Sequence, residues 1–507
     1  MLVLQLRKQN QMDNLHFYQQ HDIDCLFDKL KGQRKGRLLY QLPTGGGKTV
    51  IFSEIAKRFI QTFNKKVIVL THRTELCKQT TKALKQSGVI NKVINSSVKK
   101  ITKKDSFECF VAMVETLKNR IDEGLIDTSK IGLVIVDEAH HNSFHKLFEK
   151  FGNASIIGVT ATPLSADINL PMKKFYYELI IGEQIASLID KGFLARPKFF
   201  AYDVELNSLR LGQKGDFSIT TSDELYSSPA MLDLLMHSYE SHCRGKKTLI
   251  FNNGIFTSRK VLESFQAKGY PIRHLDNGTS ANERTEILNW FKKTKDAVLT
   301  SVSILTTGFD EPTIKAVIVN RATTSLTLYH QMVGRGARKM GNKKTFSLID
   351  LGNNADRLGS WEAPLDWIDI FEHPEVYYER LNQAAKETHL ISSELRNKFP
   401  NSLEISFDVL SAHQNCISQG LKPKTVMIDS QRQHALMCVE NSQTVVEALN
   451  LAGELDAEIT YRVKQYAKCL GKVTKNYVKW LEQDYKEQLK KMICKMASQI
   501  HPLEQAV

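Results

Sequence analysis

The sequence predicts an α/β protein with two tandem parallel-sheet domains followed by a mainly helical C-terminal domain. Three observations lead to this prediction. Short apolar runs alternate with amphipathic helical stretches up to about Ile181, and a second series of the same kind ends near Asp350. Beyond about Trp361 the strand patterns fade and helical patterns dominate. Apolar strands separated by helices form parallel sheets that are covered on both faces, so each series predicts one sheet.

The predicted elements follow one another at short intervals. The first series predicts strands over residues 37–42, 66–71, 107–113, 133–137 and 155–160, with helices over 50–63 and 73–87. Residues 182–197 have a helical pattern that ends the first domain, and 206–229 predict a long irregular connection. The second series predicts strands over 248–252, 272–275, 297–300, 316–320 and 345–350. We therefore expect a first domain over 1–197, a connection over 198–232, a second domain over 233–365 and a helical domain over 366–507.

The composition is that of a globular protein without a membrane segment. Of the 507 residues, 42% are hydrophobic and 24% are charged, and no stretch is apolar enough to span a bilayer. The apolar opening from Met1 to Leu6 is too short for the core of a signal peptide. The eight cysteines are scattered without a CxxC pair, which predicts buried thiols rather than a zinc ribbon or a disulfide framework. We expect a cytoplasmic protein, associated with the nucleoid if it acts on DNA.

The chain is basic. Its 69 Lys and Arg residues exceed its 55 Asp and Glu residues, which gives a formal net charge of +14. Such a charge attracts polyanions and speeds their encounter with the protein. Nucleic acid is the partner that this balance favours.

A glycine-rich loop, PTGGGKT over residues 43–49, lies between the first predicted strand and the first predicted helix. Glycines let the backbone fold so that its N–H groups point at a phosphate, and the start of the helix adds its positive dipole. The lysine would reach the β- and γ-phosphates, and the last threonine would place its hydroxyl on Mg²⁺. Leu42 replaces the first glycine of the usual pattern. The predicted phosphate-binding residues are Thr44, Gly45, Gly46, Gly47, Lys48 and Thr49.

Two carboxylates end the strand predicted over 133–137. Asp137 and Glu138 stand where ligands of parallel sheets bind, at the carboxyl end of a strand. Asp137 is predicted to hold Mg²⁺ together with Thr49, and Glu138 to polarise the attacking water as general base. Either acid alone could simply cap the next helix. Together with the upstream loop, the pair predicts nucleotide hydrolysis.

Motif by motif, the first half of the chain resembles a superfamily 2 helicase of the DExH type. Residues 15–19 resemble the Q motif, in which Gln19 would read the adenine edge. Residues 41–50 resemble motif I, 71–76 motif Ia of the Res-subunit branch, 136–141 motif II and 160–163 motif III. Residues 114–116, VET, depart from the Thr-x-Gln that the family tends to show in motif Ib.

The second half of the chain completes this resemblance. Residues 249–252 resemble motif IV, 305–312 resemble motif V, and 331–338 match the QxxGRxxR of motif VI. Arg335 and Arg338 are three residues apart, so on a helix they are expected to share one face. Alone, either arginine could lie solvated on a helix surface. In this motif they resemble arginine fingers that neutralise the charge developing on the γ-phosphate.

The resemblance implies two RecA-like domains that use ATP and Mg²⁺. It assigns catalysis to Lys48, Asp137, Glu138, Gln331, Arg335 and Arg338, and extends the ATP site to Gln19, Gly308 and Asp310. It assigns nucleic-acid contacts to Thr71, Arg73, Asn252 and Thr307. ATP binding would pull the two domains together and hydrolysis would let them part, so each cycle would move the protein along a strand.

Residues 346–359 resemble the segment that follows motif VI in RadD-like bacterial DNA helicases, relatives of the Res-subunit and XPB branch. RadD proteins also carry a cysteine-rich zinc element further along the chain. This sequence lacks that element.

The C-terminal part leaves two interpretations open. Residues 461–496 carry ten Lys or Arg residues against three acidic residues, interleaved with aromatic rings. Rings among cations could bind nucleic acid directly. Alternatively, the helical spacing of Tyr477, Trp480 and Leu481 could face a core and leave only a basic outer face. Protein partners of this region also remain open.

The sequence therefore predicts an ATP-dependent helicase or translocase that acts on nucleic acid, with DNA favoured in repair or branched-DNA processing. An RNA helicase of the same architecture is the first alternative, because 2′-OH contacts cannot be identified from one sequence. A scaffold without turnover and the motor subunit of a restriction or defence complex are the others.

Overall fold

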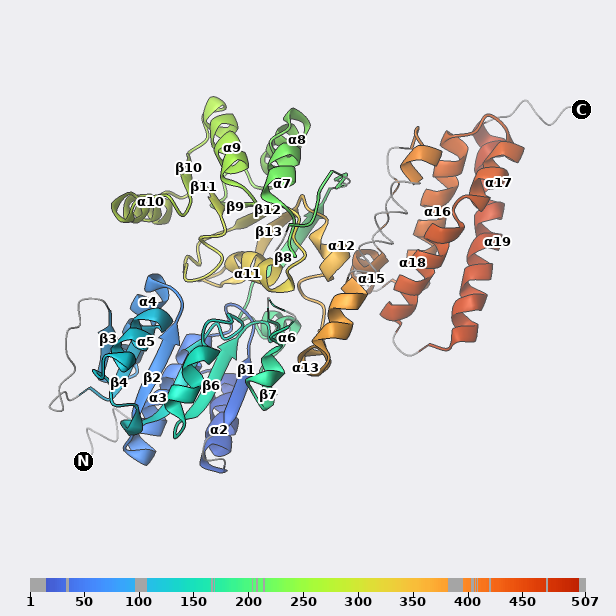
Figure 1. Cartoon of the computed structure of the whole chain (residues 1–507). Helices are drawn as coiled ribbons and strands as arrows, with labels where there is room; N and C mark the ends of the chain where they lie inside the picture. Colours follow the sequence, from blue (N-terminus) through green and yellow to red (C-terminus); the bar gives the residue numbers. More distant parts are fainter. Residues whose placement is uncertain are drawn as a thin grey trace, which may run out of the picture. The chain divides into compact units, whose positions relative to one another are not determined.

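The computed structural model in Figure 1 describes most of the chain. The described residues are 15–32, 36–95, 107–165, 167, 169–202, 204–206, 208–212, 215–381, 395–402, 405, 407, 409–418, 421–470 and 473–500. They form two compact units. The first contains both sheets and ends at Tyr378, and the second contains the C-terminal helices from Glu379 onward.

The first sheet has seven described strands, and every strand pair in it is parallel. Its order is β3-β4-β2-β5-β6-β1-β7. The fully buried β5 lies at the centre, as expected for an uninterrupted apolar strand. The strands are β1 (Arg37–Gln41), β2 (Lys66–Thr71), β3 (Asn91–Ile94), β4 (Cys109–Met113), β5 (Ile131–Asp137), β6 (Ser155–Thr160) and β7 (Glu178–Ile181).

Helices lie on both faces of this sheet in Figure 1. They are α2 (Phe17–Gly32), α3 (Lys48–Phe63), α4 (Thr74–Gln86), α5 (Val114–Asp122) and α6 (Ile185–Asp190). Three short 3₁₀ segments, η1 (Thr128–Lys130), η2 (His145–Phe151) and η3 (Met172–Lys174), complete the described part of this domain.

The second sheet has six described strands in the order β10-β11-β9-β12-β13-β8, again all parallel. The strands are β8 (Arg196–Ala201), β9 (Thr248–Asn252), β10 (Ile272–Leu275), β11 (Val298–Val302), β12 (Ala316–Asn320) and β13 (Thr345–Asp350). The helices of this domain are α7 (Ile219–Tyr226), α8 (Pro229–His242), α9 (Ile255–Ala267), α10 (Ala281–Lys293) and α11 (Leu326–Ala337). The two parallel sheets, each with its helices, are the two tandem RecA-like domains.

The predicted connection over 198–232 differs from the structure. The edge strand β8 pairs with β13 in the second sheet, and α7 and the start of α8 also fall within the segment. The strand β8 is paired on one side only, and its residues are half-exposed or exposed. Its sequence, RPKFFA, therefore lacks the continuous apolar run by which other strands are predicted. Its Pro197 is tolerated at such an edge. The first domain therefore ends before β8.

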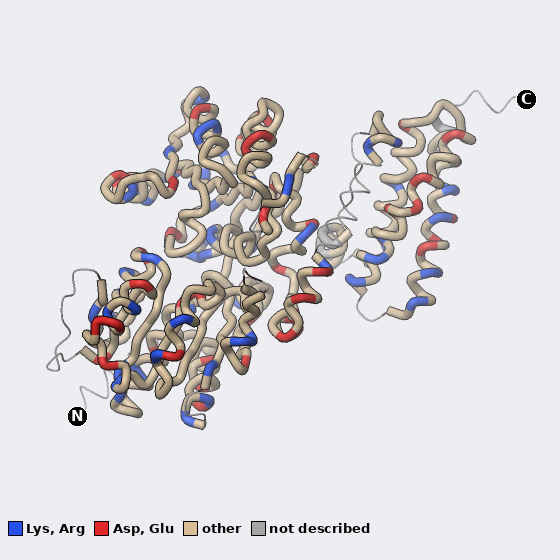
Figure 2. Tube along the Cα trace, viewed as in Figure 1, with Lys and Arg blue, Asp and Glu red and all other residues tan. Residues whose placement is uncertain are grey.

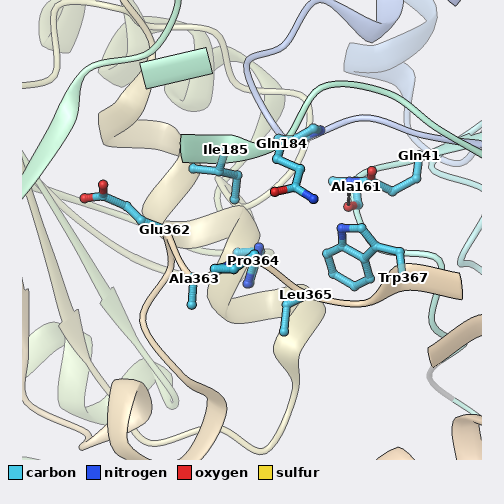
Figure 3. Close-up of a pocket in the computed structure, with 11 residues that line it drawn as sticks. Gln41, Ala161, Gln184, Ile185, Glu362, Ala363, Pro364, Leu365 and Trp367 are labelled. Atoms are coloured by element: carbon cyan, nitrogen blue, oxygen red, sulfur yellow. Dashed lines mark hydrogen bonds between the residues drawn. The ribbon is translucent and has the colours of Figure 1, made fainter. Parts of the chain in front are cut away.

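The boundary predicted at residue 366 also differs from the structure. Residues 361–378, which include α13 (Trp367–Glu372), return to the first domain. The hydroxyl of Tyr378 donates to the carbonyl oxygen of Ser165 at 2.7 Å, and Trp361 and Trp367 are buried. Figure 3 shows the small pocket beneath this segment, with Trp367 beside Ala161 and Gln184. Burial of two tryptophans fixes the segment on the two-sheet unit, which a helical pattern alone could not reveal.

The second unit is helical, as the sequence predicts. It contains α15 (Val409–Ser418), α16 (Lys424–Glu440), α17 (Val445–Gly453), α18 (Asp456–Cys469) and α19 (Lys475–Ile500) around an apolar core of its own. Arg462 is buried in this core, where its guanidinium meets Glu458 at 2.6 Å and also donates to the Ser430 hydroxyl and the Gln433 amide oxygen. Of the helices in the described residues, none is both long and apolar enough to cross a bilayer.

Candidate active site

The glycine-rich loop joins β1 to α3 as the sequence predicts. Gly45 and Gly47 both have φ of +90°, a conformation that side chains with a Cβ rarely adopt. Gly47 is the N-cap of α3, so the unpaired N–H groups of the helix start belong to this loop. The arrangement is suited to an anion such as a phosphate group.

Leu42 explains how the loop tolerates the loss of its first glycine. Its side chain is fully buried beneath the loop, and a Cβ built on Gly46 would lie 2.9 Å from its Cγ. Leu42 thus fills the space under Gly46, while its carbonyl oxygen accepts a hydrogen bond from Nζ of Lys48 at 3.2 Å. Leu42 in place of glycine therefore changes the packing beneath the loop and leaves the turn made by Gly45, Gly46 and Gly47 intact.

Asp137 and Glu138 lie where β5 ends. Glu138 has φ of 54°, an uncommon conformation for a residue with a side chain, and its N–H donates to Oδ1 of Asp137 at 3.1 Å. Oε2 of Glu138 is buried and has no hydrogen-bond partner. Burial, and then the charge of Glu138, raise the pKa of Asp137 to about 7. The two carboxylates thus share one desolvated pocket.

Lys48 belongs to the same pocket. Burial lowers the pKa of its ammonium, the carboxylates of Glu138 and Asp137 raise it, and the guanidiniums of Arg335 and Arg338 lower it further. The two carboxylates and the two guanidiniums therefore all lie within electrostatic reach of Lys48, although they come from both domains. This convergence brings together the predicted catalytic groups, apart from Gln331.

The donor set fits Mg²⁺ held jointly with a nucleotide. No group of three or more His, Cys, Asp or Glu among the described residues forms a complete metal site by itself. Mg²⁺ usually takes one or two protein oxygens, substrate phosphates and waters, so one carboxylate beside a phosphate loop is sufficient. Asp137, with its buried carboxylate, and Thr49 at the start of α3 would supply those oxygens.

The Q-motif segment holds the phosphate loop. The Tyr18 hydroxyl donates to the carbonyl oxygen of Gly46 at 2.7 Å. The side chain of Gln19 is buried, and a Cβ built on Gly47 would lie 2.3 Å from its Nε2. Oε1 of Gln19 accepts from the backbone N–H of His16 at 3.1 Å. Gln19 therefore touches the loop itself, and its predicted contact with the adenine edge stays a prediction.

The two arginines of motif VI meet at one carbonyl group, but not on one helix face. Helix α11 ends at Ala337, and Arg338 is its extended C-cap, with ψ of 134°, bridged to Leu194. The expectation that both arginines stand on a helix is therefore wrong for Arg338, because the bridge draws the chain out of the helix. Both guanidiniums nevertheless donate to the carbonyl oxygen of Phe309, Arg335 at 2.6 Å and Arg338 at 2.7 Å.

Arg338 also approaches the phosphate loop. A Cβ built on Gly45 would lie 3.6 Å from its Cγ. Its Nη1 meets Oδ1 of Asp310 at 2.5 Å, so Asp310 is an ion-pair partner of this arginine. Gly308, by contrast, lies against Glu75 and Leu76 of α4, and its carbonyl oxygen accepts from Gln79 at 2.6 Å. The assignment of Gly308 to the ATP site is not supported by this position.

A chain of polar contacts joins motifs II, III and VI. Nδ1 of His140 lies 3.0 Å from the hydroxyl of Thr160, and its Nε2 lies 3.4 Å from Nε2 of Gln331. The Thr162 hydroxyl donates to that of Thr327 at 2.8 Å. Gln331 thus contacts motif II from the second domain. The histidine and the two threonines join the carboxylate pair to α11.

Gly334 lets α11 approach the phosphate loop. A Cβ built on it would lie 2.7 Å from Cβ of Thr44 and 2.8 Å from its Cγ2, closer than such atoms approach. We expect Gly334→Ala to keep the domains apart and to lower kcat for ATP at least tenfold, while ATP still binds the first domain. Stopped-flow nucleotide binding and steady-state hydrolysis would separate the two effects.

Gly453→Ala in α17 is the matched control, because a Cβ there meets nothing within 4 Å. Alanine favours a helix over glycine by roughly 1 kcal/mol, so neither variant should lose stability through propensity. Equal kcat values for the two variants would contradict the role assigned to Gly334.

The predicted nucleic-acid residues divide into two groups. Arg73 of motif Ia donates to the carbonyl oxygen of Ile304 at 2.9 Å, so it lies where the two domains meet. The hydroxyl of Thr307 is buried without a hydrogen-bond partner. Asn252, however, is fully buried, with its amide bonded to Asn320 and Thr300 at 2.8 Å.

Thr71 is also fully buried, and its Oγ1 lies 2.9 Å from Sγ of Cys77. The structure thus corrects the assignment of Asn252 and Thr71 as contacts, because neighbouring strands and α4 occupy the polar groups that a strand of nucleic acid would need.

Lys343 is a site residue that sequence reasoning missed. It follows motif VI, and its ammonium donates to the carbonyl oxygens of Gly336 at 2.6 Å and Arg338 at 2.8 Å. It therefore secures the backbone that carries both arginines. Burial and the neighbouring cations lower its pKa to about 7. No sequence pattern marks it, since only the turn after α11 brings it back to the helix end.

Several buried histidines make the stability of the protein dependent on pH. Burial lowers the pKa of His330 to about 4, and burial with the nearby His141 lowers that of His72 to about 3. The pKa values of His140 and His141 are also lowered by burial. In the unfolded chain these rings titrate near pH 6.5, so their stabilising contribution is complete above that pH and is lost as the pH falls.

We therefore expect the melting temperature to fall between pH 7 and pH 5. Asp22, Asp137 and Glu362, whose pKa values are raised, act in the opposite direction, but they are three groups against seven histidines whose pKa values are lowered. His330→Gln should make the fall smaller, and the exposed His237→Gln should not. Thermal unfolding followed by circular dichroism at several pH values measures this, and identical slopes for all three proteins would refute it.

Comparisons with known proteins agree with this geometry. Residues 13–165 match the family model "Type III restriction enzyme, res subunit", and residues 229–340 match "Helicase conserved C-terminal domain". A "51.5 kDa protein" of Lactococcus phage (isolate 7-9) is 30% identical over 66% of this chain and 70% of its own length.

Two further relatives extend these matches. "Putative ATP-dependent helicase IRC3" of Saccharomyces cerevisiae is 29% identical over 69% of this chain, and the match spans about half, 53%, of that protein. A solved structure titled "The fragment structure of a putative HsdR subunit of a type I restriction enzyme from Vibrio vulnificus YJ016" has the same fold, with a TM-score of 0.55 and 22% identity over 69% of this chain and 67% of that one. The chain therefore belongs to the superfamily 2 helicases, the ATP-hydrolysing helicases, in their Res-subunit branch.

Proposed function

We propose that the protein is an ATP- and Mg²⁺-dependent motor that moves along DNA, in repair or branched-DNA processing. The observation that carries this proposal is the convergence of five side chains from two domains. Lys48, Asp137 and Glu138 come from the first domain, and Arg335 and Arg338 come from the second. A site divided in this way needs both domains for hydrolysis, so its chemistry is coupled to their relative position.

Each residue has a distinct role in the proposed reaction. The loop N–H groups and Lys48 bind the phosphates, and Oε2 of Glu138, which accepts no hydrogen bond within the protein, takes the proton of the attacking water. Mg²⁺, held by Asp137 and Thr49, would neutralise charge on the phosphate oxygens. Arg335 and Arg338 stabilise the negative charge that develops on the γ-phosphate.

Movement would follow from the contacts between motifs Ia and V. Arg73 and Gln79 of the first domain hold the carbonyl oxygens of Ile304 and Gly308 in the second, and Arg284 meets Glu75 at 3.0 Å. These contacts form and break as the domains close and open. A nucleic-acid strand that touches this edge would be gripped differently in the two states.

DNA is the proposed track because the first domain matches a subunit model of restriction enzymes, which act on DNA. The net charge of +14 supports a polyanionic partner of either kind. The same ATP site would serve a helicase that moves along RNA. It would also serve the motor subunit of a restriction complex that has a separate nuclease. The place of action that we propose is the cytoplasm, at the nucleoid.

The test is ATP hydrolysis measured without nucleic acid and with single-stranded, duplex and forked DNA or single-stranded RNA. Stimulation by DNA alone, strongest on forks or duplex, is the expected result. Stimulation by RNA alone would overturn the proposed track and keep the motor. Absence of hydrolysis under every condition would overturn the motor itself, unless a co-purifying subunit restored it.

A further inference from the structure

The corner where α18 runs into α19 carries an unusual concentration of positive charge. From Ile459 to Leu481 the sequence has no acidic residue, whereas it has one arginine and five lysines. Figure 2 shows several Lys and Arg segments at this end of the bundle. The arginine, Arg462, is buried and paired with Glu458, so it is not part of the surface charge. The lysines supply that charge.

Four of these lysines are exposed. Lys464 and Lys468 lie one turn apart on α18, and Lys475 and Lys479 lie one turn apart on α19. Within the described part of the chain, none of the four has a carboxylate partner, whereas Lys486 further along α19 meets Asp456 at 3.0 Å. Four cations without counter-charges form a site that favours an anionic partner.

The register of the two helices brings the lysines to nearly the same level. The hydroxyl of Thr460 donates to Glu482 at 2.9 Å, and Asp456 meets Lys486, so α18 and α19 run antiparallel. Continuing this register toward the corner places Lys464 level with Val478, the neighbour of Lys479, and Lys468 level with Thr474, the neighbour of Lys475. The four cations thus line the two sides of one corner.

An exposed aromatic pair stands on the same turn of α19. The rings of Tyr477 and Trp480 are stacked with their centroids 5.7 Å apart, and the two side chains are 38% and 55% exposed. Leu481 and Tyr485 of the same helix are buried and already anchor it to the core. The interpretation of α19 as a packing helix is therefore confirmed for Leu481 but wrong for Tyr477 and Trp480, whose rings at the corner are exposed.

We propose that this corner, made by Lys464, Lys468, Lys475, Tyr477, Lys479 and Trp480, is an accessory binding site for single-stranded nucleic acid. Bases stack on the Tyr477–Trp480 pair, and the lysines meet the phosphates. Stacking tolerates every base, because each has a π-face, and it requires unpaired bases. The site would hold a strand outside the motor domains, and binding there needs no ATP.

Trp480 provides a direct signal for the test. Of the four tryptophans in the chain, Trp361 and Trp367 are buried and Trp290 is half-buried, so Trp480 is the exposed one. Titration of the full chain with oligothymidylate or oligouridylate, without ATP, should quench its fluorescence to saturation. Trp480→Phe should lose the quench and keep the affinity measured by anisotropy, since a phenyl ring still stacks.

Trp480→Ala tests the energy of stacking. A stacked base contributes about 1–3 kcal/mol, which corresponds to a loss of affinity of roughly five- to 150-fold for this site. The paired change Lys475→Gln with Lys479→Gln should weaken binding and reduce the slope of log affinity against log salt by about 1.4, since each phosphate contact on a single strand contributes about 0.7. Lys490→Gln with Lys491→Gln, two exposed lysines further along α19, is the charge-matched control and should change the affinity much less.

Two results would overturn the proposal. One is that Trp480→Ala binds the strand as tightly as the unmodified protein, while the tryptophan fluorescence of the unmodified protein does not respond to either oligonucleotide. The other is equal losses in the two double-lysine variants, which would indicate only non-specific attraction. ATP hydrolysis without nucleic acid should be unchanged in Trp480→Ala, so failure of this site and failure of the proposed motor give different results.

Discussion

Glu138→Gln is expected to abolish ATP turnover and to leave ATP binding intact. The change removes a negative charge and the ability to accept a proton but keeps the size of the side chain. Oε2 of Glu138 is buried without a hydrogen-bond partner, with Nδ1 of His140 at 3.5 Å, and the residue is held in a left-handed conformation at the end of β5. A group held in this way, at the carboxyl edge of the sheet, is placed for a ligand rather than for packing.

The expected fall in kcat is about 10²–10⁴-fold, the range typical of a general base. Phosphate release measures kcat, and a fluorescent ATP analogue measures binding. Glu149→Gln is the control, because that side chain is exposed near η2, away from the carboxylate pair. If Glu138→Gln turned over ATP at the rate of this control, the base would have to be another group.

The sequence predicts the interior strands of both sheets well and misses three strands at their edges. Central strands such as β5 and β12 are buried along their whole length, so their apolar runs stand out. The edge strands β3, β7 and β8 have few buried positions and give no clear pattern, whereas the edge strand β10 lies where the sequence predicts it, at Ile272–Leu275. A hydrophobic pattern appears in the sequence only where side chains are buried, and a short edge strand has few buried side chains.

Part of the candidate active site could likewise be predicted from the sequence, and part could not. Backbone motifs such as the glycine turn and the carboxylates after β5 are local, so their sequence is sufficient to identify them. Contacts between the domains are not local: nothing in the sequence shows that Gly334 faces Thr44, or that Lys343 reaches back to the carbonyl oxygen of Arg338. The error at Asn252 has the same origin. A polar residue at a strand end is read as a ligand contact, but Asn320 on the adjacent strand occupies its amide.

Arg338→Gln is expected to lower kcat for ATP by about 10³-fold or more, as for arginine fingers in general, with a smaller effect on ATP affinity. Arg338 is the motif VI arginine that approaches the phosphate loop, beside Gly45, and its side chain is 20% exposed. Arg335 is more deeply buried, so its replacement would also leave a buried carbonyl oxygen unpaired. Arg338 therefore gives the cleaner test of the charge supplied by the second domain.

Two further variants separate charge from geometry. Arg338→Lys keeps the charge but loses the planar fork that here meets the Phe309 carbonyl and Asp310, so we expect only partial recovery of kcat. Arg244→Gln, an exposed arginine of the second domain, should leave kcat unchanged. If Arg338→Gln reduced ATP affinity and left kcat unchanged, the guanidinium would bind the ground state as strongly as the transition state. If it reduced neither, hydrolysis would not depend on this arginine, and the coupling of chemistry to domain closure would have to rest on Arg335 alone.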